Sequence, residues 1–140
     1  MTRREIFPMP MLLAGRPPLC CDTADLPLRA VSFLDTELRI DLSRTPALAR
    51  VGGAVKLIDD QRKLNLILTH PEKELYVVLD RECTHGGGAL AYSQRRKTVQ
   101  CTCWGRSEFA LDGGVVGGPA KRPVRRYRSR VNDGVLVVTL

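Results

Sequence analysis

The chain has few of the residues on which most catalytic and membrane-spanning proteins depend. Its 140 residues include two histidines, one tryptophan, three tyrosines and three phenylalanines. No apolar run reaches the roughly 18 residues that a membrane-spanning helix needs, so we expect no such helix. A Ser-His-Asp set, a nucleophile elbow and a phosphate-binding loop are all missing from the sequence. We therefore expect no catalysis by this chain alone.

Acidic residues are outnumbered, because 22 lysines and arginines face 15 aspartates and glutamates, for a net charge of +7. This surplus favours acidic partners. It is densest in KRPVRRYRSR (121–130), where we expect Arg126, Arg128 and Arg130 to share one face of a strand. We interpret that face either as a docking surface for an acidic redox partner or lipid headgroups, or as a solvated face. We expect no nucleic-acid partner, because Tyr127 alone offers a stacking surface there.

The first 29 residues contain five of the nine prolines and no sustained periodicity. We interpret residues 1–29 as an extended, proline-rich arm that lies over the body of the protein or over a partner. TRREIF (2–7) resembles a twin-arginine export signal. The apolar stretch that follows is short, holds two prolines and has no clear cleavage site, so we do not interpret the arm as an export signal.

Residues 30–140 have the pattern of one all-β domain with many short strands. The turn PEK separates LNLILTH (64–70) from ELYVVLD (74–80), which predicts a hairpin, and NDG predicts another near the C-terminus. His70, at the turn before a proline, is expected to be solvated. TPALARV (45–51) fits about one helical turn. The remaining expected strands are 31–43, 52–58, 97–102, 107–111, 124–131 and 134–140.

Three of the five cysteines and one of the two histidines lie in ECTHGGGAL (82–90) and QCTCWGRSEF (100–109). Fifteen residues separate His85 from Cys101 and 17 separate it from Cys103. Thiolate and imidazole ligands together suit zinc or an iron–sulfur centre. The glycines after His85 permit positive φ and a close approach of backbone to inorganic sulfide. Two such loops that meet at one tip would form a four-ligand metal site.

This pattern resembles that of the Rieske iron–sulfur proteins, in which Cys-x-His is followed after about 15 to 17 residues by Cys-x-x-His. GGPAKRP (117–123) resembles the proline-containing loop that covers the cluster in that family, and residues 122–140 resemble its closing strands. The resemblance covers residues 30–140. It implies an antiparallel base domain that carries a smaller cluster-binding lobe from about Leu79 to Pro119.

The second ligand box departs from the family pattern. The position of its histidine is Trp104 if Cys101 is the ligand, and Arg106 if Cys103 is the ligand. The loop differs in length by one residue, judged from Phe109. Gly88 stands where some members have a cysteine that forms a disulfide with the position of Cys103.

Two interpretations of the site stay open, and we favour the first. In the first, a 2Fe–2S cluster is bound by Cys83, His85, Cys101 and Cys103, and the extra thiolate lowers its reduction potential. In the second, the cluster has been lost and Trp104 fills its space. A zinc site with the same four ligands is a third, minor alternative. The residues expected to support the cluster loops are Gly86, Gly87, Gly105, Ser107, Gly118 and Pro119.

The resemblance implies electron transfer as the function, in a subunit or partner of a larger redox complex. The alternative is a cluster-free subunit that uses the Rieske fold for structure or binding. The implied partner is a redox protein, such as a cytochrome or the large subunit of an oxidase, within a membrane-associated complex. The compartment stays open between the cytoplasmic and periplasmic faces of a bacterial-type membrane.

Overall fold

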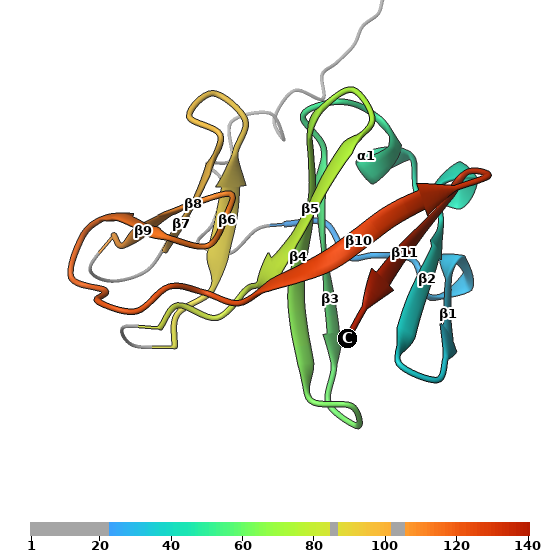
Figure 1. Ribbon diagram of the computed structural model, residues 1–140, viewed down its shortest axis with the longest axis horizontal. Helices are drawn as coiled ribbons and strands as arrows, with labels where there is room; N and C mark the ends of the chain where they lie inside the picture. The colour runs from blue at the N-terminus through green and yellow to red at the C-terminus, as the bar shows by residue number, and fades with distance from the viewer. Residues whose placement is uncertain (1–22, 85–86, 102–105) are drawn as a thin grey trace, which may run out of the picture.

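The computed structural model describes residues 23–84, 87–101 and 106–140. It confirms the all-β prediction, since these residues form two antiparallel sheets, one of seven strands and one of four (Figure 1). Short helical turns, η2 (Leu28–Ala30), η3 (Leu42–Arg44) and α1 (Pro46–Ala49), lie beside the larger sheet. No helix in the described residues is long and apolar enough to cross a membrane.

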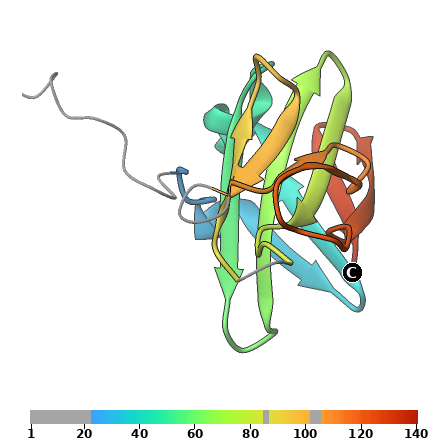
Figure 2. The same cartoon turned by 90° about the vertical axis from the view of Figure 1, so that its left-hand side faces the viewer.

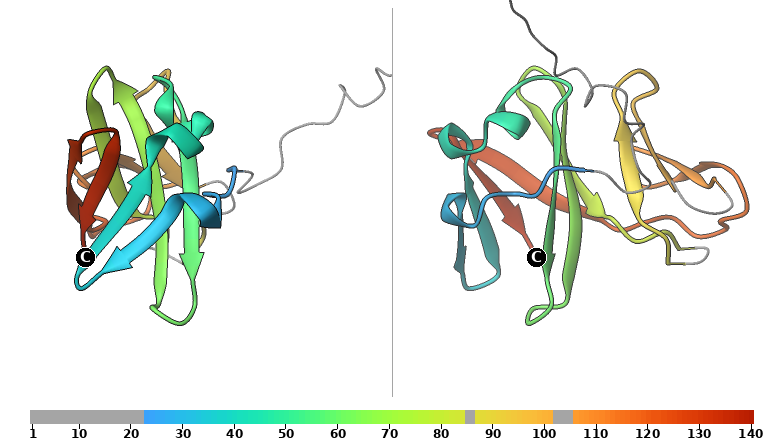
Figure 3. Two further views of the ribbon diagram at one scale, coloured as in Figure 1. Left: turned by 90° about the vertical axis from the view of Figure 1, so that its right-hand side faces the viewer. Right: turned by 180° about the vertical axis from the view of Figure 1, so that it is seen from behind.

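The seven-stranded sheet has the order β1-β2-β11-β10-β5-β4-β3. It is curled, so that the hairpin of β1 and β2 at one end faces β3 and β4 at the other (Figure 3). The curl encloses one apolar core, in which Leu38 and Ile40 of β2 pack in the same cluster as Val55 and Leu57 of β3. The strands of this sheet are β1 (Val31–Leu34), β2 (Glu37–Asp41), β3 (Ala54–Asp59), β4 (Leu64–Glu72), β5 (Leu75–Asp80), β10 (Arg126–Asn132) and β11 (Val135–Thr139).

The four-stranded sheet has the order β6-β7-β8-β9 and lies between β5 and β10 in the chain. Viewed from its own side, it stands in front of the larger sheet (Figure 2). Its strands are β6 (Leu90–Ser93), β7 (Thr98–Cys101), β8 (Glu108–Ala110) and β9 (Val115–Gly117). Leu90, Val99 and Phe109 of this sheet pack with residues of β4 and β5 in a second apolar cluster.

Strand β4 contributes side chains to both apolar clusters. Leu66 and Leu68 belong to the core inside the curl, whereas Ile67 belongs to the cluster under the small sheet. Side chains alternate between the two faces of a strand, so a strand covered on both faces needs a continuous apolar run. The sequence LNLIL supplies that run, and the same alternation in β5 places Val78 inside the curl and Leu79 under the small sheet.

The two predicted hairpins and the helical turn are confirmed. β4 pairs with β5, and β10 pairs with β11 across the NDG turn, where Asp133 and Gly134 have φ of 52° and 76°. Two positive φ values in succession characterise the tight turn that matches the twist of antiparallel strands. The predicted strand 31–43 is instead two strands, because the chain turns at Asp35, whose φ is 54°. β6 and β9 were not among the predicted strands.

The prediction of a solvated His70 is wrong. His70 lies within β4 with 5% of its surface exposed, and its ring stacks on that of Tyr76 at 4.1 Å between centroids. Its Nδ1 is 3.0 Å from the carbonyl oxygen of Leu48. β4 continues past Pro71 through a bulge, so His70 sits inside the strand and the α1 segment covers it.

The predicted arm lies mostly in residues 1–22, which are outside the described residues. Its last residues run along β3. The Leu26 amide donates to the carbonyl of Lys56, and the Lys56 amide donates to the carbonyl of Ala24, both at 2.8 Å. The final part of the arm therefore adds a short parallel bridge to the edge of the larger sheet.

Candidate metal centre

Cys83 lies where the chain leaves β5 and turns toward the small sheet. Its amide donates to the carbonyl of Gly88 at 2.7 Å, and its carbonyl accepts from the amide of Gly87 at 2.9 Å. Gly87 has a φ of 77°, which glycine adopts without steric cost. Cys83 itself is 3% exposed. This loop is therefore closed by its own backbone; His85 and Gly86, expected to be a ligand and a supporting residue, lie outside the described residues.

Cys101 is the last residue of β7 and is 5% exposed. It pairs with Leu90 in the sheet, and its amide donates to the carbonyl of Ser107 at 2.8 Å. That bond closes the second loop, as the bond between Cys83 and Gly88 closes the first. The expected ligand Cys103 and the expected supporting residue Gly105 lie outside the described residues.

The register places the two described thiols on one face. Glu82 bridges Ala89 and Leu90 pairs with Cys101, so the segment that contains Gly88 runs between the two cysteines. Residues opposite one another in antiparallel strands point to the same side. Cys83 and Cys101 also belong to the same apolar cluster. The structure thus brings together two of the four sequence-predicted ligands.

Gly88 has a role that the sequence alone did not reveal. A Cβ at this position would lie 2.9 Å from the Sγ of Cys101, closer than a methyl group and a sulfur can approach. The missing side chain leaves the room in which the Cys101 thiol sits. The sequence signal was present in the three successive glycines, but which of them faces a thiol depends on the strand register.

The loop after β9, which contains the predicted supporting residues Gly118 and Pro119, packs against the second cysteine loop. Gly118 has a φ of 86°, and a Cβ there would lie 2.5 Å from the Cα of Ser107. Ser107 is fully buried, and its Oγ accepts a hydrogen bond from the amide of Ala120 at 3.1 Å. Pro119 stands between these two contacts and is exposed.

The same loop also reaches the first cysteine loop. The hydroxyl of Thr84 donates to the carbonyl of Arg122 at 2.7 Å, and the Arg122 guanidinium donates to the carbonyl of Thr84 at 3.3 Å. Three loops that are separated in sequence therefore meet around Cys83 and Cys101. Each of these hydrogen bonds joins a side chain of one loop to the backbone of another.

A buried carboxylate supports the small sheet from within. Glu108 accepts two hydrogen bonds from Arg96, at 2.8 and 2.9 Å, and one from the hydroxyl of Thr98 at 2.5 Å. The bonds from Arg96, followed by the bond from Thr98, lower the pKa of Glu108 from 4.5 to about 2. The carboxylate therefore stays charged near neutral pH and ties β8 to the turn between β6 and β7.

The charged turn QRRK (94–97) lies away from the cysteines. Ser93 pairs with Thr98 at the closed end of the hairpin of β6 and β7, while Cys101 lies at the open end. The side chains of Gln94 and Lys97 donate to the carbonyl of Pro71 at 3.0 and 2.8 Å. The turn therefore fastens the small sheet to the larger one and does not surround the cysteines.

A cavity of about 670 Å³ opens beside the first cysteine loop. Cys83, Thr84 and Gly87 form one wall, and Asp80 and Tyr127 lie on another. The hydroxyl of Tyr127 donates to Asp80 at 2.7 Å. Burial, followed by this hydrogen bond, raises the pKa of Tyr127 to about 12, so the phenol keeps its proton. The cavity gives small molecules a route to the backbone next to Cys83.

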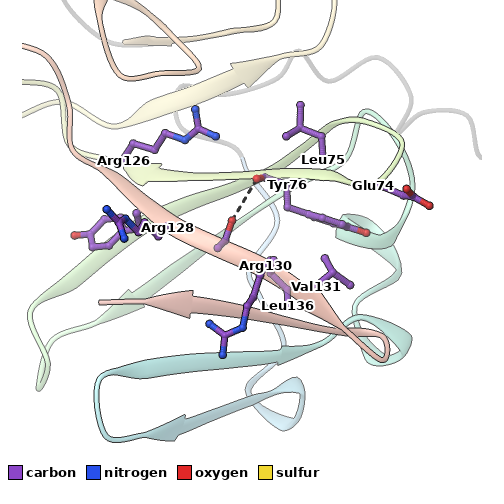
Figure 4. Close-up of a pocket in the computed structure, with 10 residues that line it drawn as sticks. Glu74, Leu75, Tyr76, Arg126, Arg128, Arg130, Val131 and Leu136 are labelled. Carbon is purple, nitrogen blue, oxygen red and sulfur yellow. Dashed lines mark hydrogen bonds between the residues drawn. The ribbon is translucent and has the colours of Figure 1, made fainter.

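A second hollow, of about 520 Å³, lies between β5 and β10 on the larger sheet (Figure 4). The two strands pair only at Leu79 and Val78, so they separate toward the start of β5. Arg126, Arg128 and Arg130 line the hollow, and all three are exposed, as predicted for one strand face. This basic groove follows β5 from Glu74 to the level of Leu79, with which Arg126 pairs.

Two buried thiols on one face are a donor set that suits a thiolate-bound metal centre. Within the described ranges, no group of three or more histidine, cysteine, aspartate or glutamate side chains is placed to hold a metal ion. Two of the four expected ligands are outside those ranges. The described residues therefore account for one half of such a centre.

Comparisons with known proteins also indicate an iron–sulfur domain. Residues 41–128 match the family model of the Rieske [2Fe-2S] domain. The cytochrome b6-f complex iron-sulfur subunit of Chlorobaculum tepidum is 29% identical over 58 residues, which are 41% of this chain and 32% of that protein. The chain thus spans about a third of that relative's length.

A solved structure shares the fold. The crystal structure of the cyanobacterial plasma membrane Rieske protein PetC3 from Synechocystis PCC 6803 matches with a TM-score of 0.54 and 23% identity. The match covers 63% of this chain and 87% of that chain.

Proposed function

Because the chain belongs to the Rieske [2Fe-2S] domain family, we propose that it transfers single electrons as a subunit or partner of a larger redox complex. The observation that carries the proposal is the placement of Cys83 and Cys101. Both thiols are buried on one face, and the absence of a side chain at Gly88 makes room for the thiol of Cys101.

The proposed ligands are Cys83 and Cys101 for one iron, and His85 and Cys103 for the other. The last two are assigned from the sequence pattern alone. When bound, a 2Fe–2S cluster supplies a site that accepts and releases one electron. The residues of this chain hold the thiolates, exclude water from them and keep their loops closed through the amides of Cys83, Cys101 and Ala120. A third thiolate in place of the usual second histidine lowers the reduction potential.

The competing proposal is a cluster-free subunit that keeps the fold for binding. It is favoured by the apolar cluster that already surrounds Cys83 and Cys101, including Leu90 and Phe109. Such packing stabilises the site without a metal ion. Trp104 at the position of the second histidine agrees with the same alternative.

For the partner, we propose a redox protein with an acidic docking surface. The basic groove supports this, because within the described part of the chain no ion pair holds Arg126 or Arg128. Replacing both arginines with glutamine should weaken binding of a fluorescent polyglutamate peptide and reduce its salt dependence; an unchanged affinity would exclude the groove as the dock.

The experiment that tests the function is electron paramagnetic resonance of anaerobically purified protein reduced with dithionite, together with an iron assay. We expect about two irons per chain and a 2Fe–2S signal with nitrogen couplings from His85. Cys83→Ser and Cys101→Ser should each abolish the signal. Cys21→Ser, outside the proposed ligand set, should keep it. Protein without iron and without a signal would instead support the cluster-free subunit.

A further inference from the structure

Arg81 carries a buried positive charge two residues before Cys83. The residue is 5% exposed, and its Nη1 donates to the Oδ1 of Asn65 at 3.0 Å. Its Nε is buried and has no hydrogen-bond partner. Within the described ranges no carboxylate pairs with Arg81; that of Asp80, the preceding residue, accepts from Tyr127.

The strand register places Arg81 on the face that the small sheet covers. Ile67, Leu79 and Cys83 all belong to the cluster beneath that sheet, and they alternate with residues that face the other core. Arg81 continues this row, because its amide donates to the carbonyl of Asn65 and its carbonyl accepts from the amide of Leu90. Its side chain therefore lies between the two sheets, in the row that leads to Cys83.

The hydrogen-bond partner of Arg81 also lies near the first cysteine loop. Asn65 accepts the hydrogen bond from the guanidinium and lines the cavity that Cys83 also lines. A neutral amide cannot balance the charge of a guanidinium. A buried arginine without a counter-ion is costly, and such residues are usually retained beside an opposite charge or a bound group.

The proposed ligand set supplies that opposite charge. A 2Fe–2S cluster with two thiolates and two neutral imidazoles is uncharged overall when oxidised. Replacing one imidazole by a thiolate leaves a net negative charge, and one-electron reduction by the redox partner adds another. A fixed positive charge close by then stabilises the reduced form more than the oxidised form.

We propose that Arg81 is the built-in counter-charge of this centre and raises its reduction potential, which offsets part of the lowering caused by the third thiolate. This inference rests on the proposed function and names the residue that tunes it. Arg81 acts through the field of its charge and is not a ligand.

Redox titration of the cluster-loaded full chain, followed by its visible absorption, tests the inference. Arg81→Met, which keeps the length of the side chain but not its charge, should shift the midpoint potential to more negative values. Arg81→Lys should stay closer to the parent. Arg39→Met is the matched control, because the Nε of Arg39 is likewise buried without a hydrogen-bond partner but lies on β2. The midpoint potential of Arg39→Met should equal that of the parent.

If Arg81→Met fails to fold, Asn65→Asp provides the second test. A carboxylate at position 65 would pair with the guanidinium and cancel its charge, so the midpoint potential should again become more negative. An unchanged potential in Arg81→Met or Asn65→Asp, with the iron signal intact, overturns the inference while the proposed function stands. A parent chain that holds no iron overturns both. An equal shift in Arg81→Lys and Arg81→Met would show that shape, and not charge, matters.

Discussion

The two sheets of this protein are stabilised in different ways. The larger sheet encloses a core of side chains drawn from opposite ends of the same curled sheet. The smaller sheet shares its core with β4 and β5, and its loops meet through backbone contacts at Gly88, Ser107 and Gly118. The larger sheet therefore depends on its own apolar core, whereas the smaller sheet depends on a shared core and on its loop contacts. We expect the smaller sheet to open locally without unfolding of the larger sheet.

Truncating the largest core side chains should separate the two sheets most clearly. Leu38 and Phe109 are both fully buried, one in each cluster. Leu38→Ala should cost about 2 to 5 kcal/mol and Phe109→Ala about 3 to 5 kcal/mol, from lost transfer energy and the cavity left behind. In native-state hydrogen exchange, Leu38→Ala should expose amides of both sheets together. Phe109→Ala should expose those of β7 and β8 first, and joint exposure in both variants would contradict the division.

The next largest effect should come from Gly118. Gly118→Ala introduces left-handed strain of about 1 to 2 kcal/mol, and the clash with Ser107 adds overpacking of about 1 to 3 kcal/mol. Gly134→Ala is the matched control, because it has a similar positive φ of 76° but no atom within 4 Å of the new Cβ. Urea unfolding measures both. Equal losses would mean that contact with Ser107 does not hold the loop in place.

Gly88→Ala should affect the metal centre more than the fold. The new methyl group meets only the end of a side chain, the Sγ of Cys101, which can move away by rotation. We expect a loss of stability below about 1 kcal/mol but a clear fall in bound iron per chain. Gly117→Ala, with nothing within 4 Å of the new Cβ, should retain its iron. Full iron content in Gly88→Ala would show that the position of this thiol is not critical.

The smallest effect should appear only in acid. Glu108 has a pKa of about 2 in the folded protein against 4.5 ordinarily, so it binds protons more readily in the unfolded chain. Its contribution to stability is complete above about pH 4.5 and is lost as the pH falls toward about 2. Glu108→Gln should flatten the decline in unfolding temperature over that window. Glu74→Gln, in the turn before β5, should leave the decline as in the parent.

The sequence predicted much of the larger sheet but less of the smaller one. The hairpin of β4 and β5 was visible in two apolar runs around a turn, and NDG marked the last hairpin. The turn at Asp35 was missed because a non-glycine residue adopts positive φ there. β6 was missed because four residues carry too little periodicity to distinguish a strand from a loop.

Cysteine spacing singled out Cys83 and Cys101, which the structure places in one apolar cluster, but it did not reveal what surrounds them. The roles of Gly88 and Arg81 depend on which strands become neighbours, and a one-residue change of register would reverse both. His70 shows the converse, because its burial comes from the α1 segment, which no local pattern connects to β4.

The chain leaves the larger sheet at β5 and returns to it at β10, and these strands are direct neighbours, joined at Leu79 and Arg126. The outgoing and returning backbones are thus about 5 Å apart, the spacing of paired strands. By connectivity, the whole segment between them is an insertion that a short turn could replace. The packing argues against such a replacement, because without the segment Ile67, Val77 and Leu79 would face water. A shortened chain would close its sheet but would expose an apolar face through which it would aggregate.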